Sequence, residues 1–183
     1  MDNRVPPETE LLELARQFNQ QALARIYDSY SQGLYSYAMR LLGDQDVAED
    51  CVAETFSRFL QALQARRGPE SFLQAYLYRM AHNWIVDHFR REPLHPVELT
   101  EEHRDENANP EVDTSRHLQQ EGLRMALRKL TPDQQQVIAL KYLEGWENEE
   151  IARSLKKPVG AVKSLQHRAL ATLQRILNRE EFP

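Results

Sequence analysis

The stretch "ENEEIARSLKKPVGAVKSLQHRAL" (Glu147–Leu170) predicts two helices joined by a tight turn. A short helix around Asn148–Leu155 is followed by the turn "KKPVG" and then by a longer, basic helix. This order is the pattern of a helix-turn-helix unit, whose second helix enters the major groove of DNA. The sequence therefore indicates that the C-terminal part of the chain binds DNA.

The second helix of this unit has one apolar side and one side of small and basic residues. The apolar side holds Val162, Leu165, Ala169, Leu173 and Ile176. The opposite side holds Gly160, Lys163, Ser164, His167 and Ala171. Small residues let a helix approach the groove floor, and Lys, Ser and His can donate hydrogen bonds to base edges or phosphates. We expect phosphate contacts from Lys156, Lys157, Arg168 and Arg175.

Charge is segregated along the chain, although the net charge is only −5. Residues 92–113 carry eight acids and one base, a charge of −7, which leaves +2 for the remainder. Residues 151–179 carry seven bases and no acid. Segregation says more about partners than the net charge does. The absence of acidic residues from 151–179 favours DNA binding over the alternative, which is a basic face that only contacts solvent.

The segment 92–117 divides the chain. It has three prolines, many acids and no helical periodicity, so it is expected to be a flexible acidic linker. It separates a domain of residues 1–91 from a domain of residues 118–183. No strand alternation is evident, and the expected fold is all-α: two small helical domains that the linker leaves free of one another.

Glycine, proline and helix-capping residues mark the expected helix ends. Apolar residues spaced by three and four precede Gly43, a good left-handed stop, and Asp44 can cap the next helix. A further helix is expected from Ser71 to Arg91. In the second domain, "TPDQ" from Thr131 supplies a cap, a proline at the first helical position and a glutamine for a capping box.

The helix predicted to begin after Asp44 carries a run of acids without a base: Asp46, Glu49, Asp50 and Glu54. Like charges four residues apart destabilise a helix mildly. The positive end of the helix dipole explains the acids in the first turn, but Glu54 lies too far along to benefit. We interpret this face as a docking surface for a basic protein partner.

The helix predicted from Ser71 to Arg91 presents an outward face of polar and aromatic residues, after a loop that contains glycine and proline. The face holds Tyr78, Arg79, Asn83, Asp87 and Arg90. Basic and aromatic side chains together suit the binding of unpaired nucleotides, because every nucleobase offers a face for stacking. Tyr76 and Trp84 are assigned to the core instead, which leaves Tyr78 and the loop as the candidates for DNA contact.

Signatures of an enzyme or a cofactor site are missing. The histidines lack metal-ligand spacing, and there is no phosphate-binding glycine loop and no GxSxG motif. The lone Cys51 cannot form an internal disulfide, which fits a reducing cytoplasm. No run of about 18 apolar residues is present, so membrane insertion is not expected. We predict a cytoplasmic protein without catalysis, metal or cofactor.

Three segments, residues 23–63, 72–92 and 127–177, together resemble a known family. They are similar, in this order, to the sigma factors of the extracytoplasmic-function group in their minimal two-domain form. Three departures concern the recognised sequence: Pro158 and Val159 replace a capping Ser or Thr, Glu147 replaces a Ser, and Leu165 stands where many members have Arg.

The resemblance implies a role for each surface. The acidic helix would bind the basic clamp helices of core RNA polymerase. The helix from Ser71 to Arg91 and the loop after Arg66 would open the minus-ten element of promoter DNA and hold a flipped base. The linker would thread toward the active-site cleft of the polymerase. Lys163, Ser164 and His167 would read the minus-thirty-five element, and an anti-sigma factor is a further expected partner.

Two other classes of function stay open on the sequence alone. One is a stand-alone helix-turn-helix regulator whose N-terminal bundle dimerises or senses a ligand. The other is a helical adaptor with no DNA role. The acidic helix argues against a regulator, which has no use for a face that docks on polymerase.

Overall fold

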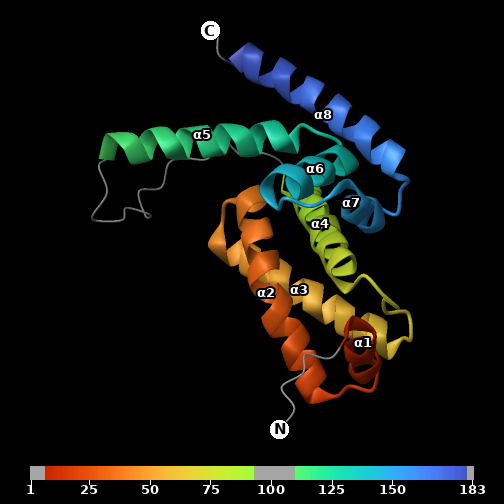
Figure 1. The fold of residues 1–183 in the computed structure, drawn as a ribbon. Coiled ribbons are helices and arrows are strands. Elements are labelled where there is room, and N and C mark those ends of the chain that lie inside the picture. Colours follow the sequence, from red (N-terminus) through yellow and green to blue (C-terminus); the bar gives the residue numbers. More distant parts are fainter. Residues whose placement is uncertain (1–6, 93–109, 181–183) are drawn as a thin grey trace.

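The computed structural model describes residues 7–92 and 110–180, and these ranges contain helices and no strand (Figure 1). The N-terminal domain consists of α1 (Glu8–Arg16), α2 (Gln20–Leu42), α3 (Gln45–Gln64) and α4 (Leu73–Arg91). The C-terminal domain consists of α5 (Pro110–Arg128), α6 (Pro132–Ile138), the π-helical turn η1 (Ala139–Leu143), α7 (Asn148–Leu155) and α8 (Val159–Glu180). The predicted all-helical, two-domain class is confirmed.

Several helix ends lie where the glycine and capping residues predicted them. Helix α2 ends at Gly43 in the left-handed conformation, with φ of 77°. The Asp44 side chain then caps α3 by accepting a hydrogen bond from the Val47 N–H at 2.9 Å. At α6, Thr131 and Gln134 form both hydrogen bonds of a capping box. Each bond satisfies a backbone N–H that has no partner within the helix.

The C-terminal limit of the predicted linker needs a correction. Helix α5 begins at Pro110, so residues 110–117 are helical rather than extended. A proline is well tolerated at the first helical position. Residues 93–109, the rest of the expected linker, lie outside the described residues.

The two domains pack against each other, so the expectation that they are free of one another is wrong. Helix α4 contacts α7, and α2 contacts η1 and α5. Figure 1 shows α4 running from the N-terminal bundle to the underside of α6 and α7, while α8 lies at the far end from α1. Buried apolar side chains form one cluster that extends from Leu12 in α1 to Leu173 in α8.

A buried histidine joins three helices across this domain boundary. The Nε2 atom of His82 in α4 lies 2.9 Å from the Pro132 carbonyl oxygen in α6, and its Nδ1 atom lies 2.8 Å from the Tyr37 hydroxyl in α2. A carbonyl only accepts, so Nε2 carries the proton and Nδ1 accepts from the hydroxyl. Burial lowers the pKa of His82 to about 4, against the weaker opposing effects of the Pro132 hydrogen bond and Asp133.

We predict that acidification destabilises the fold through His82. Between pH 6.5 and pH 4 the unfolded chain binds a proton at this histidine that the folded chain does not. The free energy of unfolding therefore falls as the pH is lowered, by about 2 kcal/mol from this group between pH 7 and pH 5. Urea denaturation at the two pH values measures the loss. The variant His82→Gln cannot titrate at this position, and an equally large loss in that variant would contradict the assignment.

Candidate nucleic-acid interface

Helix α8 exposes the face that the sequence assigned to base reading. Val162 and Ala169 are completely buried, because this side packs on α6 and α7. Lys163, Ser164 and His167 are all exposed on the opposite side. The Ser164 hydroxyl donates to the Gly160 carbonyl at 3.1 Å, so its oxygen is left to accept from a base. The face thus offers an acceptor between two basic side chains.

The cations predicted to contact phosphates are not equivalent. Lys156, Arg168 and Arg175 are exposed. Lys157 forms a salt bridge of 3.0 Å with Asp133, which comes from α6 rather than from the acid-free segment. An acid nearby in space but distant in sequence therefore neutralises one of these four cations. A sequence window that counts charges cannot detect such a pair.

Contacts between α7 and α8 fix the angle of the reading helix. The Gln166 amide donates to the Asn148 side chain at 3.0 Å, which ties the middle of α8 to the start of α7. Glu147 caps α7 in a capping box with Glu150, so the departure from Ser at this position leaves the helix end satisfied. Sequence reasoning missed the role of Gln166, because a half-buried glutamine leaves no periodic signal.

Helix α3 presents its acids to solvent. Asp46, Glu49 and Asp50 are exposed, and no cation of the described residues lies within salt-bridge distance of them. Glu54 differs, because its carboxylate pairs with Arg58 at 2.7 Å on the same helix. The unpaired negative charge is therefore concentrated in the first two turns of α3.

The five residues predicted to face outward on α4 lie in two different environments. Asn83 and Arg90 are exposed, and Asp87 is paired with Arg90 at 3.5 Å. Tyr78 is only 4% exposed, so the prediction of an outward-facing Tyr78 is wrong for this structure. Arg79 is half-buried, and its Nη1 atom has no hydrogen-bond partner among the described residues.

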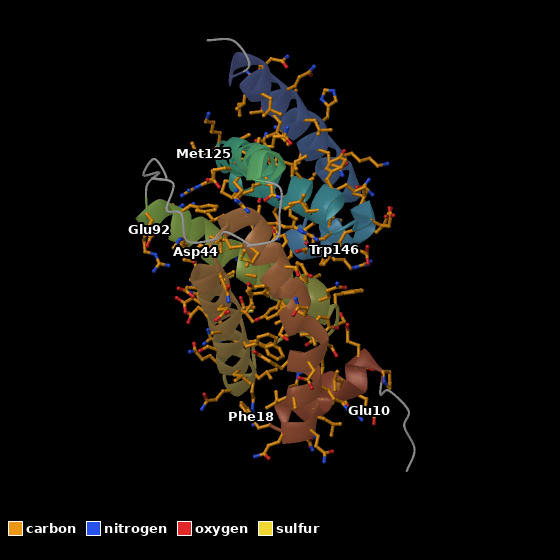
Figure 2. All side chains as sticks on the ribbon, turned by 90° about the vertical axis from the view of Figure 1, so that its left-hand side faces the viewer. Glu10, Phe18, Asp44, Glu92, Met125 and Trp146 are labelled. Carbon is orange, nitrogen blue, oxygen red and sulfur yellow. The ribbon has the colours of Figure 1, made fainter. Side chains whose placement is uncertain are left out.

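The C-terminal domain is what buries Tyr78. Its ring lies 4.9 Å, centroid to centroid, from that of Trp146, and Figure 2 shows Trp146 at the level where the two domains meet. The Tyr78 hydroxyl donates to Glu144 at 3.4 Å, and Glu144 forms a salt bridge of 2.6 Å with Arg40 of α2. Burial raises the pKa of the Glu144 carboxyl, and the Arg40 guanidinium opposes that shift.

The loop before α4 is partly covered in the same way. Phe72 has a left-handed backbone, with φ of 55°, and its side chain is 53% exposed. The guanidinium of Arg153, from α7, lies 4.6 Å above the Phe72 ring, which is a cation–π contact. Sequence reasoning placed DNA contacts in this loop but did not single out Phe72.

Other kinds of site are not evident in the part of the chain that the structure describes. Residues 7–92 and 110–180 hold no group of three or more His, Cys, Asp or Glu side chains that could bind a metal ion. Within the same ranges, no helix is both long enough and apolar enough to cross a membrane. Cys51 is buried against α4, and burial raises the pKa of its thiol to about 12.

Comparison with known proteins assigns both domains. The family model described as Sigma-70 region 2 matches residues 26–93, and that described as Sigma-70, region 4 matches residues 120–173. The fold resembles that of CnrH, solved in complex with the cytosolic domain of CnrY, with a TM-score of 0.68 and 23% identity over 94% of this chain and 97% of that one.

Two curated relatives extend the comparison. The ECF RNA polymerase sigma factor BldN of Streptomyces coelicolor is 35% identical over 92% of this chain, which spans 65% of the length of BldN. The ECF RNA polymerase sigma factor SigL of Mycobacterium tuberculosis is 32% identical over 81% of this chain and 85% of its own length. With both domains matched in the same order, the chain belongs to the extracytoplasmic-function group of RNA polymerase sigma factors.

Proposed function

We propose that this sigma factor directs core RNA polymerase to promoters, and that its two domains have different binding roles. The observation that supports this proposal is the separation of charge in space. Unpaired acids are exposed on α3, while the exposed face of α8 carries cations and small polar residues. One face suits a basic protein surface, and the other suits DNA.

The N-terminal domain, residues 1–91, docks on the polymerase through α3. Asp46, Glu49 and Asp50 are the principal docking residues, because no cation of the described chain neutralises them. Glu54 contributes less than the sequence suggested, since Arg58 already neutralises part of its charge. Complementary charge of this kind raises the rate of association and fixes the register of the complex.

The same domain recognises the minus-ten element through a surface that we call the minus-ten surface, made of the loop 66–72 and of Tyr78, Arg79, Asn83, Asp87 and Arg90 on α4. Aromatic rings beside cations and amides suit an unpaired strand, because rings stack on bases and cations bind phosphates. Asn83 and Arg90 are exposed, Arg79 is half-buried, and Tyr78 is buried against Trp146 of the C-terminal domain.

The C-terminal domain, residues 118–183, recognises the minus-thirty-five element through α8. Lys163, Ser164 and His167 face base edges, and Lys156, Lys157, Arg168 and Arg175 lie near phosphates. The protein acts in the cytoplasm, where polymerase and promoter are found. An anti-sigma factor completes the proposed partners, and RpoE from Bartonella quintana, which has a similar fold, was solved with the anti-sigma factor NepR.

We expect core RNA polymerase to transcribe from a cognate promoter only when this protein is added. Run-off transcription from a library of genomic fragments, with and without the protein, measures the effect. A reaction that contains the protein but no core polymerase supplies the control. Transcripts of equal amount and start site in both reactions would contradict the proposed function.

We predict that the double reversal Asp46→Lys/Asp50→Lys weakens binding to core polymerase by about tenfold or more at moderate salt, because two exposed attractive charges become repulsive. Both side chains are exposed, so the fold should survive. Titration against labelled core enzyme measures the affinity. The matched control is Glu10→Lys/Glu13→Lys, which makes the same charge change at exposed positions of α1. An equal loss in the control would show that net charge, not this face, is responsible.

We predict that His167→Ala and Lys156→Ala affect promoters differently. A base contact is worth about 1–3 kcal/mol of discrimination, so His167→Ala should change the preferred upstream element. Lys156 is exposed in the turn and suits a phosphate, so Lys156→Ala should weaken all promoters alike and reduce the salt slope by about one. A promoter library transcribed by reconstituted holoenzyme measures both. An unchanged element in His167→Ala would remove this residue from the reading face.

A further inference from the structure

Helix α1 packs beside the loop 66–72, which is part of the minus-ten surface. Leu12 and Ala15 of α1 are completely buried, and the helix contacts both α2 and α3. Figure 1 shows α1 next to the end of α3 from which this loop leaves. The match to Sigma-70 region 2 begins at residue 26, ten positions after α1 ends, so it assigns no role to this helix.

One hydrogen bond connects α1 to the middle of the loop. The guanidinium of Arg16, the last residue of α1, donates from Nη2 to the Pro69 carbonyl oxygen at 2.9 Å. Pro69 is buried, whereas the next two residues, Glu70 and Ser71, are exposed. Among the described residues, no other hydrogen bond reaches residues 68–71. Arg16 therefore makes the polar contact that holds this part of the loop.

The two ends of the loop are fixed by other means. Arg66 and Phe72 both have left-handed backbones, with φ of 54° and 55°. The Arg67 N–H bonds to a carbonyl in the last turn of α3 at 2.8 Å. Gly68 packs so closely that an added Cβ atom would lie 2.7 Å from the Leu63 side chain. The remaining freedom of the loop is in its middle, where the contact with α1 is made.

The position of Arg16 is itself well determined. The Asn19 N–H bonds to the Leu14 carbonyl at 3.1 Å, so the chain turns tightly after α1. The Asn19 side chain then caps α2 by accepting from the Ala22 N–H at 3.0 Å. The dipole of α1 also favours a cation at this end of the helix. The guanidinium thus extends from a rigid corner of the bundle.

We propose that α1 holds the loop 66–72 in the conformation that binds the minus-ten element, and that Arg16 is the positioning residue for this loop. A loop that is ordered before binding loses less conformational entropy and adapts less readily to a wrong base. This inference rests on the proposed function for the ligand of the loop. The contact between Arg16 and the loop depends only on the chain, so the two ideas can fail separately.

The alternative role for Arg16 is a direct phosphate contact. The side chain is exposed, and a guanidinium has N–H groups besides the one that Pro69 accepts. A phosphate contact acts on every promoter alike and contributes to the salt slope. A positioning residue instead changes which base is preferred, so the two roles predict different measurements.

The test uses the full-length chain with Arg16→Met, which keeps an unbranched side chain and removes every N–H donor. Arg16→Lys is the conservative variant, because its ammonium can still donate toward the Pro69 carbonyl. Arg25→Met is the matched control for charge, since Arg25 is an exposed cation of α2 without a partner among the described residues. Circular dichroism verifies that each variant keeps its helical content.

Limited trypsin digestion, followed by the masses of the fragments, measures the order of the loop. Trypsin cleaves after Arg66 and Arg67, and both side chains are exposed. Cleavage there should be about fivefold faster in Arg16→Met, because the loop opens more often once the hydrogen bond is lost. Arg25→Met should be cleaved at the rate of the unaltered chain. An unchanged rate in Arg16→Met would overturn the proposal.

Holoenzyme reconstituted with each variant then transcribes a library in which the minus-ten element is randomised. Arg16→Met should reduce the ratio of transcription between preferred and disfavoured minus-ten bases by about threefold, and Arg16→Lys should restore part of this ratio. The preferred minus-thirty-five element should stay the same, because α8 lies at the far end from α1. A uniform loss over all minus-ten sequences, with a smaller salt slope, would make Arg16 a phosphate contact and overturn the positioning role.

The two measurements together separate this inference from the proposed function. If the unaltered chain supports transcription but Arg16→Met changes neither digestion nor base preference, the positioning role is wrong and the sigma function stands. If digestion is faster in Arg16→Met but no chain supports transcription, α1 does order the loop and the promoter role is wrong.

Discussion

Helix α4 is packed on two sides, and the side chains on both sides need partners. The arrangement of both domains depends on these contacts. One side packs into the N-terminal bundle, where Leu77 and Ile85 are completely buried. The other meets the C-terminal domain, where Tyr78 and His82 are buried although both carry polar atoms. Burying such atoms without partners costs free energy, so the Glu144 carboxylate and the Pro132 carbonyl have to be present. These two acceptors determine where the C-terminal domain can sit.

The π-helical turn η1 is what brings one of these acceptors into place. An ordinary α-helix from Pro132 to Gly145 would rotate its last turn differently, because a π-helical turn contains an extra residue. With the wider turn, the Trp146 N–H bonds to the Leu140 carbonyl at 2.9 Å, and Gly145 adopts a φ of 73°. Glu144 and Trp146 thereby reach α2 and α4 together. A local irregularity in one domain thus fixes the contact between two.

The sequence could predict features that depend on neighbours within a few residues. The caps at Asp44 and Thr131 and the short helix Asn148–Leu155 belong to this kind, as does the division of α8 into a buried and an exposed side. The burial of Tyr78 could not be predicted from the sequence, because it depends on Trp146, which is 68 positions away. The π-helical turn was missed for a similar reason, because an apolar run shows the same spacing whether it ends in an α or a π turn. Pairing of Lys157 with Asp133 likewise depends on tertiary structure.

The same tertiary contacts change how the basic charge of the C-terminal domain should be counted. Residues 151–179 contain seven bases, but Lys157 is neutralised by Asp133, and the Arg153 guanidinium lies over the Phe72 ring. The positive charge free to attract phosphates is therefore smaller than the sequence suggests. Lys156 and Lys163 remain exposed, so this charge is concentrated in the turn before α8 and on the first turns of that helix.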